Sequence, residues 1–137
     1  GHTVQTLSDR DTISRERKIS DLTGSKSLNN KLIEIVANFK PELLILGHAD
    51  QIQNETLKTI KNFYPSLKIC QWFLDKMDDK HWKMNKNRFL KKFKYVDKNF
   101  CTTHPSAIKS LDSNKVLFIP NPVDETFENL KIYKKKY

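Results

Sequence analysis

Apolar residues along the chain alternate between the spacing of amphipathic helices and the short continuous runs of buried strands. The first clear helix carries its apolar positions from Leu28 to Phe39, with Ser27 placed to cap it and Pro41 to end it. The next segment, Glu42–Leu46, is almost continuously apolar, which is typical of a strand covered on both faces in a parallel sheet. A helix followed directly by a buried strand indicates an α/β fold.

The same alternation continues through the rest of the chain. Asn54 is placed to cap a second helix that ends before Pro65, and a third helix has its apolar face at Phe89, Leu90, Phe93 and Val96. Strands are predicted at Thr3–Leu7, Glu42–Leu46, Leu67–Leu74, Lys98–Thr103 and Lys115–Ile119. A long polar loop is predicted from Thr12 to Lys26, and a helical turn at His104-Pro105. The predicted fold class is α/β, a Rossmann-like parallel sheet with helices on both faces.

Polar residues gather where the predicted strands end, and right-handed crossovers bring those ends to one edge of the sheet. The residues expected at this edge are Asp9, Asp11, Gly47, His48, Asp50, Asp75 and His104. A glycine after a buried strand lets a ligand approach the backbone, and a neighbouring histidine can act as a general base. Residues 47–50 (GHAD) therefore indicate a catalytic or binding loop, although a strand-ending turn with local hydrogen bonds explains them equally well.

Signatures of several other chemistries are missing from the sequence. With three glycines and no GxGxxG, phosphate-binding loop, HExxH or GxSxG motif, the chain is not expected to bind a nucleotide by itself. Asp9 and Asp11 flank Arg10, which offers both carboxylates a simpler partner than a metal ion. Too few further ligands accompany them, so no metal site is predicted.

The charge balance is basic, with 25 Lys and Arg against 16 Asp and Glu and a net charge of +9. This favours anionic partners such as a membrane surface, but nearly all the cations are Lys, so no specific nucleic-acid binding is expected. Cys70 and Cys101 lie in apolar runs without CxxC spacing, as reduced structural thiols do. With no secretory signal and no long apolar span, these features indicate a cytoplasmic protein. Its basic charge would allow peripheral contact with the inner face of a membrane, and a solvated Lys-rich surface is the simpler alternative.

Several segments together resemble the acceptor-side amino-terminal domain of GT-B glycosyltransferases, most of all those of the spore-maturation type. Val116–Asp124 (VLFIPNPVD) resembles the V-x-x-I-P-N-G-V-D segment that joins the two domains of that family, with Pro122 in place of its glycine. Gly1–Val4 (GHTV) resembles the G-H-x-V that follows the family's first helix. The segments Lys40–Ile45, Gln71–Asp75 and Cys101–Leu111 are also similar to strands, and in the last case a helix, of that domain.

The resemblance implies a domain at 1–124 that lacks its first strand, followed at 125–137 by a linker toward a second domain that binds the nucleotide-sugar donor. Asn121 and Asp124 would lie in the interdomain linker, and the chain itself would need no cofactor. His48 or Asp50 would be the base of an inverting reaction. The acceptor, a cell-surface glycan or lipid precursor, would meet Gly47, Asp75, Asp9, Asp11 and His104. Without the first strand, we expect an unpaired sheet edge, bare apolar faces and no activity from this chain alone.

Two other functions stay open at this point. One is a non-enzymatic Rossmann-like or flavodoxin-like binding module. The other is a basic protein that binds nucleic acid or anionic membranes, which the net charge of +9 motivates.

Overall fold

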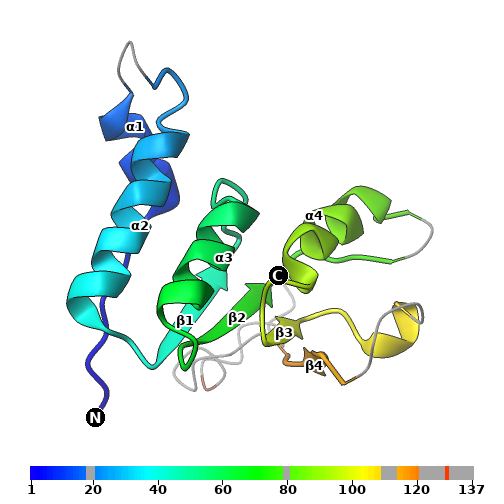
Figure 1. The fold of residues 1–137 in the computed structure, drawn as a ribbon. Coiled ribbons are helices and arrows are strands. Elements are labelled where there is room, and N and C mark those ends of the chain that lie inside the picture. Colours follow the sequence, from blue (N-terminus) through cyan, green and yellow to red (C-terminus); the bar gives the residue numbers. More distant parts are fainter. Residues whose placement is uncertain (18–20, 79–80, 109–113, 121–128, 130–137) are drawn as a thin grey trace.

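The computed structural model describes residues 1–17, 21–78, 81–108, 114–120 and 129. Its centre is a four-stranded parallel sheet (Figure 1). The strands are β1 (Leu43–Gly47), β2 (Lys68–Phe73), β3 (Lys98–Cys101) and β4 (Val116–Phe118), and they lie side by side in sequence order. The predicted α/β class with a parallel, Rossmann-like sheet is confirmed.

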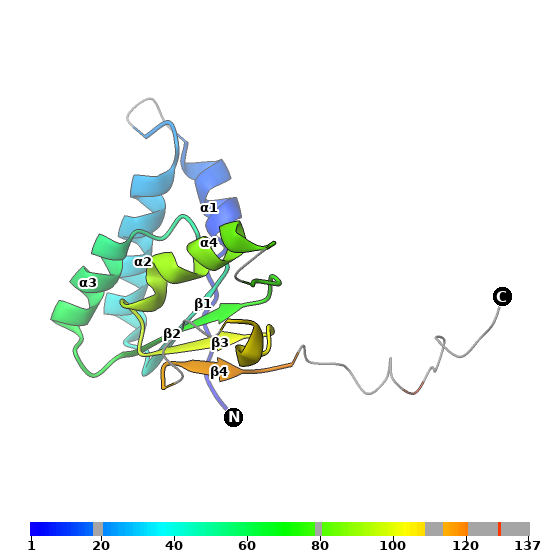
Figure 2. The ribbon, with the colours of Figure 1, turned by 90° about the vertical axis from the view of Figure 1, so that its right-hand side faces the viewer.

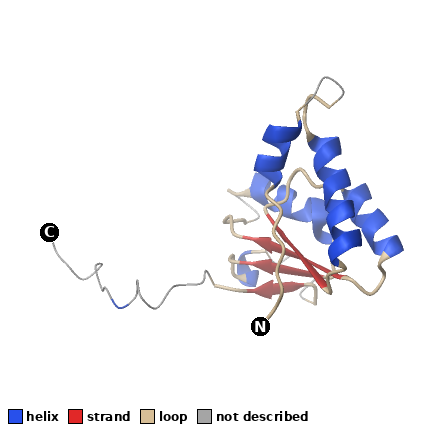
Figure 3. Ribbon diagram, turned by 90° about the vertical axis from the view of Figure 1, so that its left-hand side faces the viewer, coloured by secondary structure: helices blue, strands red, loops and turns tan. Residues whose placement is uncertain are grey.

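Three helices cover one face of this sheet: α2 (Ser25–Phe39), α3 (Asn54–Phe63) and α4 (Lys83–Phe93), as Figures 1 and 3 show. The cause is the strand order. Each strand is followed by its neighbour in the same direction, and right-handed crossovers then place every connecting helix on the same side. A short 3-10 helix, η1 (Pro105–Ala107), connects β3 toward β4. The helices that the structure describes thus leave the opposite face without a covering layer.

The core lies between the helices and the sheet in two clusters. The larger cluster packs α2 and α3 on β1 and β2, with Leu28, Ile60 and Ile69 fully buried. The smaller cluster packs α4 on β2 and β3, and the rings of Phe73 and Phe89 lie 5.6 Å apart within it. The alternation of side chains along each strand sends one set to this core and the other to the uncovered face.

The first forty residues differ most from what their pattern predicts. The predicted strand at Thr3–Leu7 is wrong: this segment pairs with no described strand, and residues 1–6 are exposed. The predicted loop from Thr12 to Lys26 is wrong in its first part, where α1 (Asp9–Glu16) forms. The Oγ of Ser8 caps this helix by accepting a hydrogen bond from the amide of Asp11 at 3.3 Å.

The junction of α1 and α2 depends on Gly24. Its φ is +67°, and a Cβ placed there would lie 2.7 Å from the carbonyl oxygen of Ile13 in α1. Any side chain at residue 24 would therefore be strained by the positive φ and would also clash with the backbone of Ile13. Gly24, and not the predicted Ser27, is the N-cap of α2, and Gln53, not Asn54, is the N-cap of α3.

The predicted interdomain linker lies outside the described residues: Asn121, Asp124 and, apart from Asn129, residues 125–137. In the part of the chain that the structure describes, no helix has the length and apolar character needed to cross a bilayer.

Candidate functional site

A pocket of about 750 Å³ opens at the carboxyl-terminal edge of β1 and β2. Ligands bind at this edge in open α/β sheets, and the volume is in the range of small-molecule sites. The pocket brings together five of the residues predicted for the site, Asp9, Gly47, His48, Asp50 and Asp75. Its charged lining also includes Arg10, Arg17 and Arg88.

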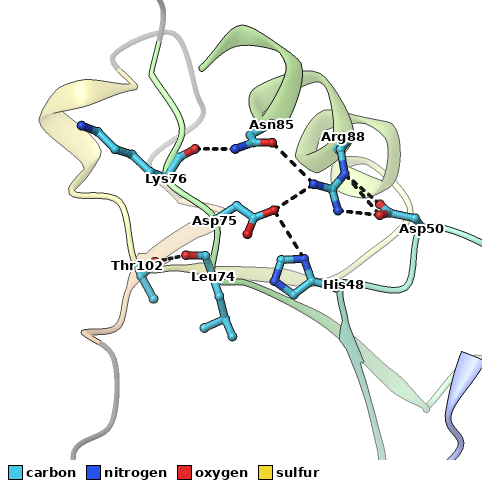
Figure 4. Close-up of polar contacts among 8 residues, drawn as sticks. All are labelled: His48, Asp50, Leu74, Asp75, Lys76, Asn85, Arg88 and Thr102. Carbon is cyan, nitrogen blue, oxygen red and sulfur yellow. Dashed lines mark hydrogen bonds and ion pairs between the residues drawn. The ribbon is translucent and has the colours of Figure 1, made fainter. Parts of the chain in front are cut away.

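Arg88 on α4 joins the loops that follow β1 and β2. Its Nη2 lies 2.5 Å from Oδ2 of Asp50, and its Nη1 lies 2.8 Å from Oδ2 of Asp75 (Figure 4). The Nε of Arg88 also donates to Asp50, at 3.2 Å, so this carboxylate is held by two guanidinium nitrogens. The hydrogen bonds with Asp50 raise the pKa of Arg88 above its ordinary value, against the opposing effect of burial. Arg88 is therefore a permanent cation that fixes both carboxylates.

His48 follows β1 with its backbone in the left-handed region, at φ 45°. For a residue other than glycine this conformation costs about 1 kcal/mol or more. The ring centroid lies 5.2 Å from that of Phe73, and Nδ1 faces Oδ2 of Asp75 at 3.8 Å (Figure 4). Among the described residues, Nε2 has no hydrogen-bond partner. A strained residue that presents an imidazole beside a carboxylate in a pocket is a candidate for proton transfer.

A buried side chain on α2 holds the loop that carries Asp50. The Nδ2 of Asn29 donates to the carbonyl oxygen of Gln51 at 3.1 Å. Its Oδ1 accepts from the amide of Gln53 at 2.8 Å and from the hydroxyl of Thr56 at 2.7 Å. Because Asn29 is only 5% exposed, the core itself positions this loop.

The loop that carries Asp75 is tied to the segment after β3. The hydroxyl of Thr102 donates to the carbonyl oxygen of Leu74 at 2.8 Å (Figure 4). The hydroxyl of Thr103 accepts from the amide of Met77, which is fully buried, at 3.1 Å. Both site loops are thus fixed by hydrogen bonds to neighbouring elements, which preorganises the pocket.

Two more guanidinium groups reach the pocket from the side of α1. Arg10 lies in the first turns of α1 and Arg17 directly follows its last residue, and both are exposed. Unlike Arg88, neither is paired with a carboxylate among the described residues. The wall that α1 forms therefore offers two cations to an anionic group.

Two residues predicted for the site do not line the pocket, namely Asp11 and His104. Asp11 is exposed in the first turn of α1. His104 follows β3, where its Nδ1 lies 2.8 Å from the hydroxyl of Ser106 and its ring centroid 5.5 Å from that of Phe118. The pocket forms where β1 and β2 end, so a residue that follows β3 is too far along the sheet to reach it.

The described residues include no group of three or more His, Cys, Asp or Glu that could hold a metal ion. The two cysteines are buried free thiols. Burial raises the pKa of Cys70 and of Cys101 above the ordinary value, so neither is a reactive thiolate.

Arg10, Arg17 and Arg88 were not among the predicted site residues, and Arg10 was expected only as a partner of Asp9 and Asp11. No spacing in the sequence connects Arg88 with Asp50, which lies 38 positions earlier and meets it only in the folded chain. Composition does contain a signal: the chain has four arginines among many lysines, and Arg10, Arg17 and Arg88 line this one pocket. In a Lys-rich chain, arginines mark positions where a planar, bidentate cation is needed.

A comparison of the chain with protein-family models, curated proteins and solved structures finds no significant match in any of the three.

Proposed function

We propose that this chain is the acceptor-side half of a two-domain glycosyltransferase, whose nucleotide-sugar donor binds a second domain. Three features support the proposal: the segments that resemble GT-B enzymes, the parallel α/β sheet, and a polar pocket at the edge where such sheets bind ligands. The observation that carries it is the placement of His48, which keeps an unfavourable backbone conformation and turns its ring toward Asp75 inside the pocket.

In this proposal His48 is the general base of an inverting transfer. Its Nε2 removes the proton from an acceptor hydroxyl as the oxygen attacks the anomeric carbon of the donor. The bond from that carbon to the nucleotide breaks, and the diphosphate leaves with the bonding electrons. Asp75, whose Oδ2 lies 3.8 Å from Nδ1, is beyond hydrogen-bond distance and stabilises the imidazolium that forms through its charge.

Asp50 has a different role, although the sequence offers it as an equal candidate for the base. Its carboxylate is held by two nitrogens of Arg88, and a base in that position would have to break both contacts to receive a proton. We assign Asp50 to positioning: it fixes Arg88, and Arg88 fixes Asp75 beside His48.

The lining of the pocket narrows the class of acceptor. Arg10 and Arg17 are cations without a carboxylate partner among the described residues, and they favour an acceptor that carries a phosphate or carboxylate. Gly47 and Asp9, which also line the pocket, would contact the hydroxyl groups of this acceptor. A phosphorylated lipid precursor or an acidic glycan fits this combination.

The same proposal places the protein in the cytoplasm, in contact with a membrane. Cys70 and Cys101 are buried free thiols and not a disulfide, as is usual in a reducing compartment. The net charge of +9 attracts the chain to an anionic membrane surface, where a lipid-linked acceptor would lie.

The reaction class is tested with the complete product of the natural gene. Incubation with UDP-glucose, UDP-N-acetylglucosamine and GDP-mannose, with and without membrane extract, should give acceptor-dependent release of nucleoside diphosphate and a product of inverted anomeric configuration. Release without acceptor dependence, or retention of configuration, would remove the base role of His48. Binding of saccharides without any transfer would favour the non-enzymatic binding module.

A further inference from the structure

A second pocket, of about 500 Å³, lies at the opposite edge of the sheet from the candidate site. It forms between the second half of α3, the segment that joins α4 to β3, and the residue directly before β4. In Figure 2 the strands run from left to right, and the ends of α3 and α4 lie on the left with the starts of β3 and β4. The volume of this pocket is in the range of small-molecule sites.

The lining of this second pocket is basic. Lysines from three separate parts of the chain meet there, against one carboxylate, Asp97, in the described part of the lining. The lysines are Lys58, Lys61, Lys94 and Lys115. Bringing like charges together costs free energy, which ion pairs or a bound anion can offset. The partners of these four side chains therefore decide whether the pocket has a free charge to offer.

Two of the four lysines are paired within the protein. The Nζ of Lys61 lies 2.9 Å from Oδ2 of Asp97 and donates to the carbonyl oxygen of Leu67 at 2.6 Å. The Nζ of Lys58 lies 2.7 Å from Oε1 of Glu55, about one turn earlier on α3. These two ammonium groups are neutralised without any ligand.

The other two lysines, Lys94 and Lys115, have no carboxylate partner among the described residues. Lys94 is exposed and directly follows α4. The carboxyl end of a helix favours a nearby cation, which accounts in part for Lys94. Lys115 is half-buried and directly precedes β4, so that explanation does not extend to it. Two ammonium groups therefore remain available to an anion.

Tyr95 adds a neutral donor beside these cations. The centroid of its half-buried ring lies 5.4 Å from the Nζ of Lys58 and 5.8 Å from that of Lys94. Its hydroxyl has no hydrogen-bond partner in the part of the chain that the structure describes, and the exposed amide of Asn62 lines the same pocket. Ammonium, hydroxyl and amide donors around one pocket match the several acceptor oxygens of a phosphate group.

We propose that this basic pocket, formed around Lys94, Tyr95 and Lys115, binds the phosphate group of an anionic ligand at a site separate from the candidate active site. The ligand is a soluble phosphorylated molecule or the headgroup of an anionic lipid, which present the same chemistry to the pocket. The inference rests on the unpaired lysines and the free hydroxyl, and it does not depend on the glycosyltransferase proposal.

Isothermal titration calorimetry with inorganic pyrophosphate at low salt tests the site in the complete gene product. Arg10→Gln and Arg17→Gln are introduced first, because these two arginines line the candidate active site and would bind the same anion there. The protein should then still bind pyrophosphate saturably. Adding Lys94→Gln and Lys115→Gln should weaken this binding about tenfold or more. Absence of saturable binding before these last two substitutions would overturn the proposal.

The matched control removes the same number of charges from another surface. Lys26 and Lys31 are exposed on α2 and do not line the basic pocket. Their replacement by Gln in the same background should change Kd by less than about twofold. Each pair of substitutions should leave Tm within about 3 °C, which separates loss of the site from loss of the fold. Equal weakening by both pairs would overturn the proposal, because it would show attraction to net charge alone.

Vesicle flotation distinguishes the two sources of the phosphate group. Recruitment to vesicles that contain phosphatidylglycerol, but not to phosphatidylcholine alone, should be lost with Lys94→Gln and Lys115→Gln if the ligand is a lipid headgroup. The Lys26 and Lys31 control should then remain bound. Pyrophosphate binding without recruitment to vesicles would assign the basic pocket to a soluble phosphorylated ligand.

Discussion

The Nη2 atom of Arg88 lies 2.5 Å from Oδ2 of Asp50, and this contact joins α4 to the loop that follows β1. Arg88→Met would leave Asp50 and Asp75 close together without their shared cation. We expect a loss of about 1–3 kcal/mol in the free energy of unfolding, measured by urea denaturation. Arg15→Met, an exposed arginine of α1 outside the pocket, should change it by less than about 0.5 kcal/mol. A loss for Arg88→Met as small as that for Arg15→Met would mean that the contacts of Arg88 add nothing to stability.

Asp97 makes stability sensitive to acid. Its carboxylate accepts from the amide of Ile69 at 2.8 Å and lies 2.9 Å from the ammonium of Lys61. Burial acts to raise the pKa of Asp97, but these two partners outweigh it and leave the pKa below the ordinary value of 3.8. The unfolded chain therefore binds a proton more readily, and the stabilisation present above pH 3.8 is lost as the pH falls through the lowered pKa.

Asp97→Asn should accordingly destabilise the protein at pH 7 by about 1–3 kcal/mol. The difference from the unsubstituted protein should shrink as the pH is lowered below 4. Urea denaturation at a series of pH values measures both quantities. A difference that stays constant down to pH 2 would show that the ionised carboxylate is not the source of the stabilisation.

Gly24 fixes the contact between α1 and α2. Gly24→Ala places a Cβ against Ile13 at a residue with φ +67°, and we expect a loss of about 1–3 kcal/mol in unfolding free energy. Gly47→Ala is the matched control, because no atom lies within 4 Å of a Cβ placed there. It should cost less than about 1 kcal/mol. If the two alanine variants unfold at the same urea concentration, the packing of α1 on α2 differs from that described.

Arg10 and Arg17 should determine the affinity for an anionic acceptor. In the complete enzyme, the double substitution Arg10→Gln and Arg17→Gln should raise KM for a phosphorylated acceptor about tenfold or more, and leave kcat within about threefold. The effect should decrease with added salt because both side chains are exposed. An unchanged KM would place the anionic group elsewhere.

Much of the sheet could be predicted because its strands are short apolar runs between clear helices. The strand predicted at Glu42–Leu46 is β1, which begins and ends one residue later, at Leu43–Gly47. The helix before it ends at Phe39, as Pro41 requires. Thr3–Leu7 could not be judged correctly from its own residues. Its alternation is that of a strand, but a strand also needs a neighbour, and no described strand supplies one.

The site residues that directly follow a strand could be predicted from the sequence. The site residue that depends on how a helix packs on the sheet could not. Gly47, His48 and Asp50 follow one strand and Asp75 follows the next, so topology alone brings them together. Arg88 reaches them because α4 packs across β2 in one particular orientation, which no local pattern specifies. Such a contact between distant segments becomes visible only in three dimensions.

The central claim is that His48 acts as the base, and the rate of transfer by the complete enzyme tests it most directly. His48→Ala should lower kcat/KM by about 100-fold or more, while His104→Ala, at a histidine outside the pocket, should change it by less than about twofold. His48→Asn, which keeps a side chain that tolerates the left-handed backbone, should be as inactive as the alanine variant, which would separate loss of the base from loss of structure. Full activity of both His48 variants would contradict the account.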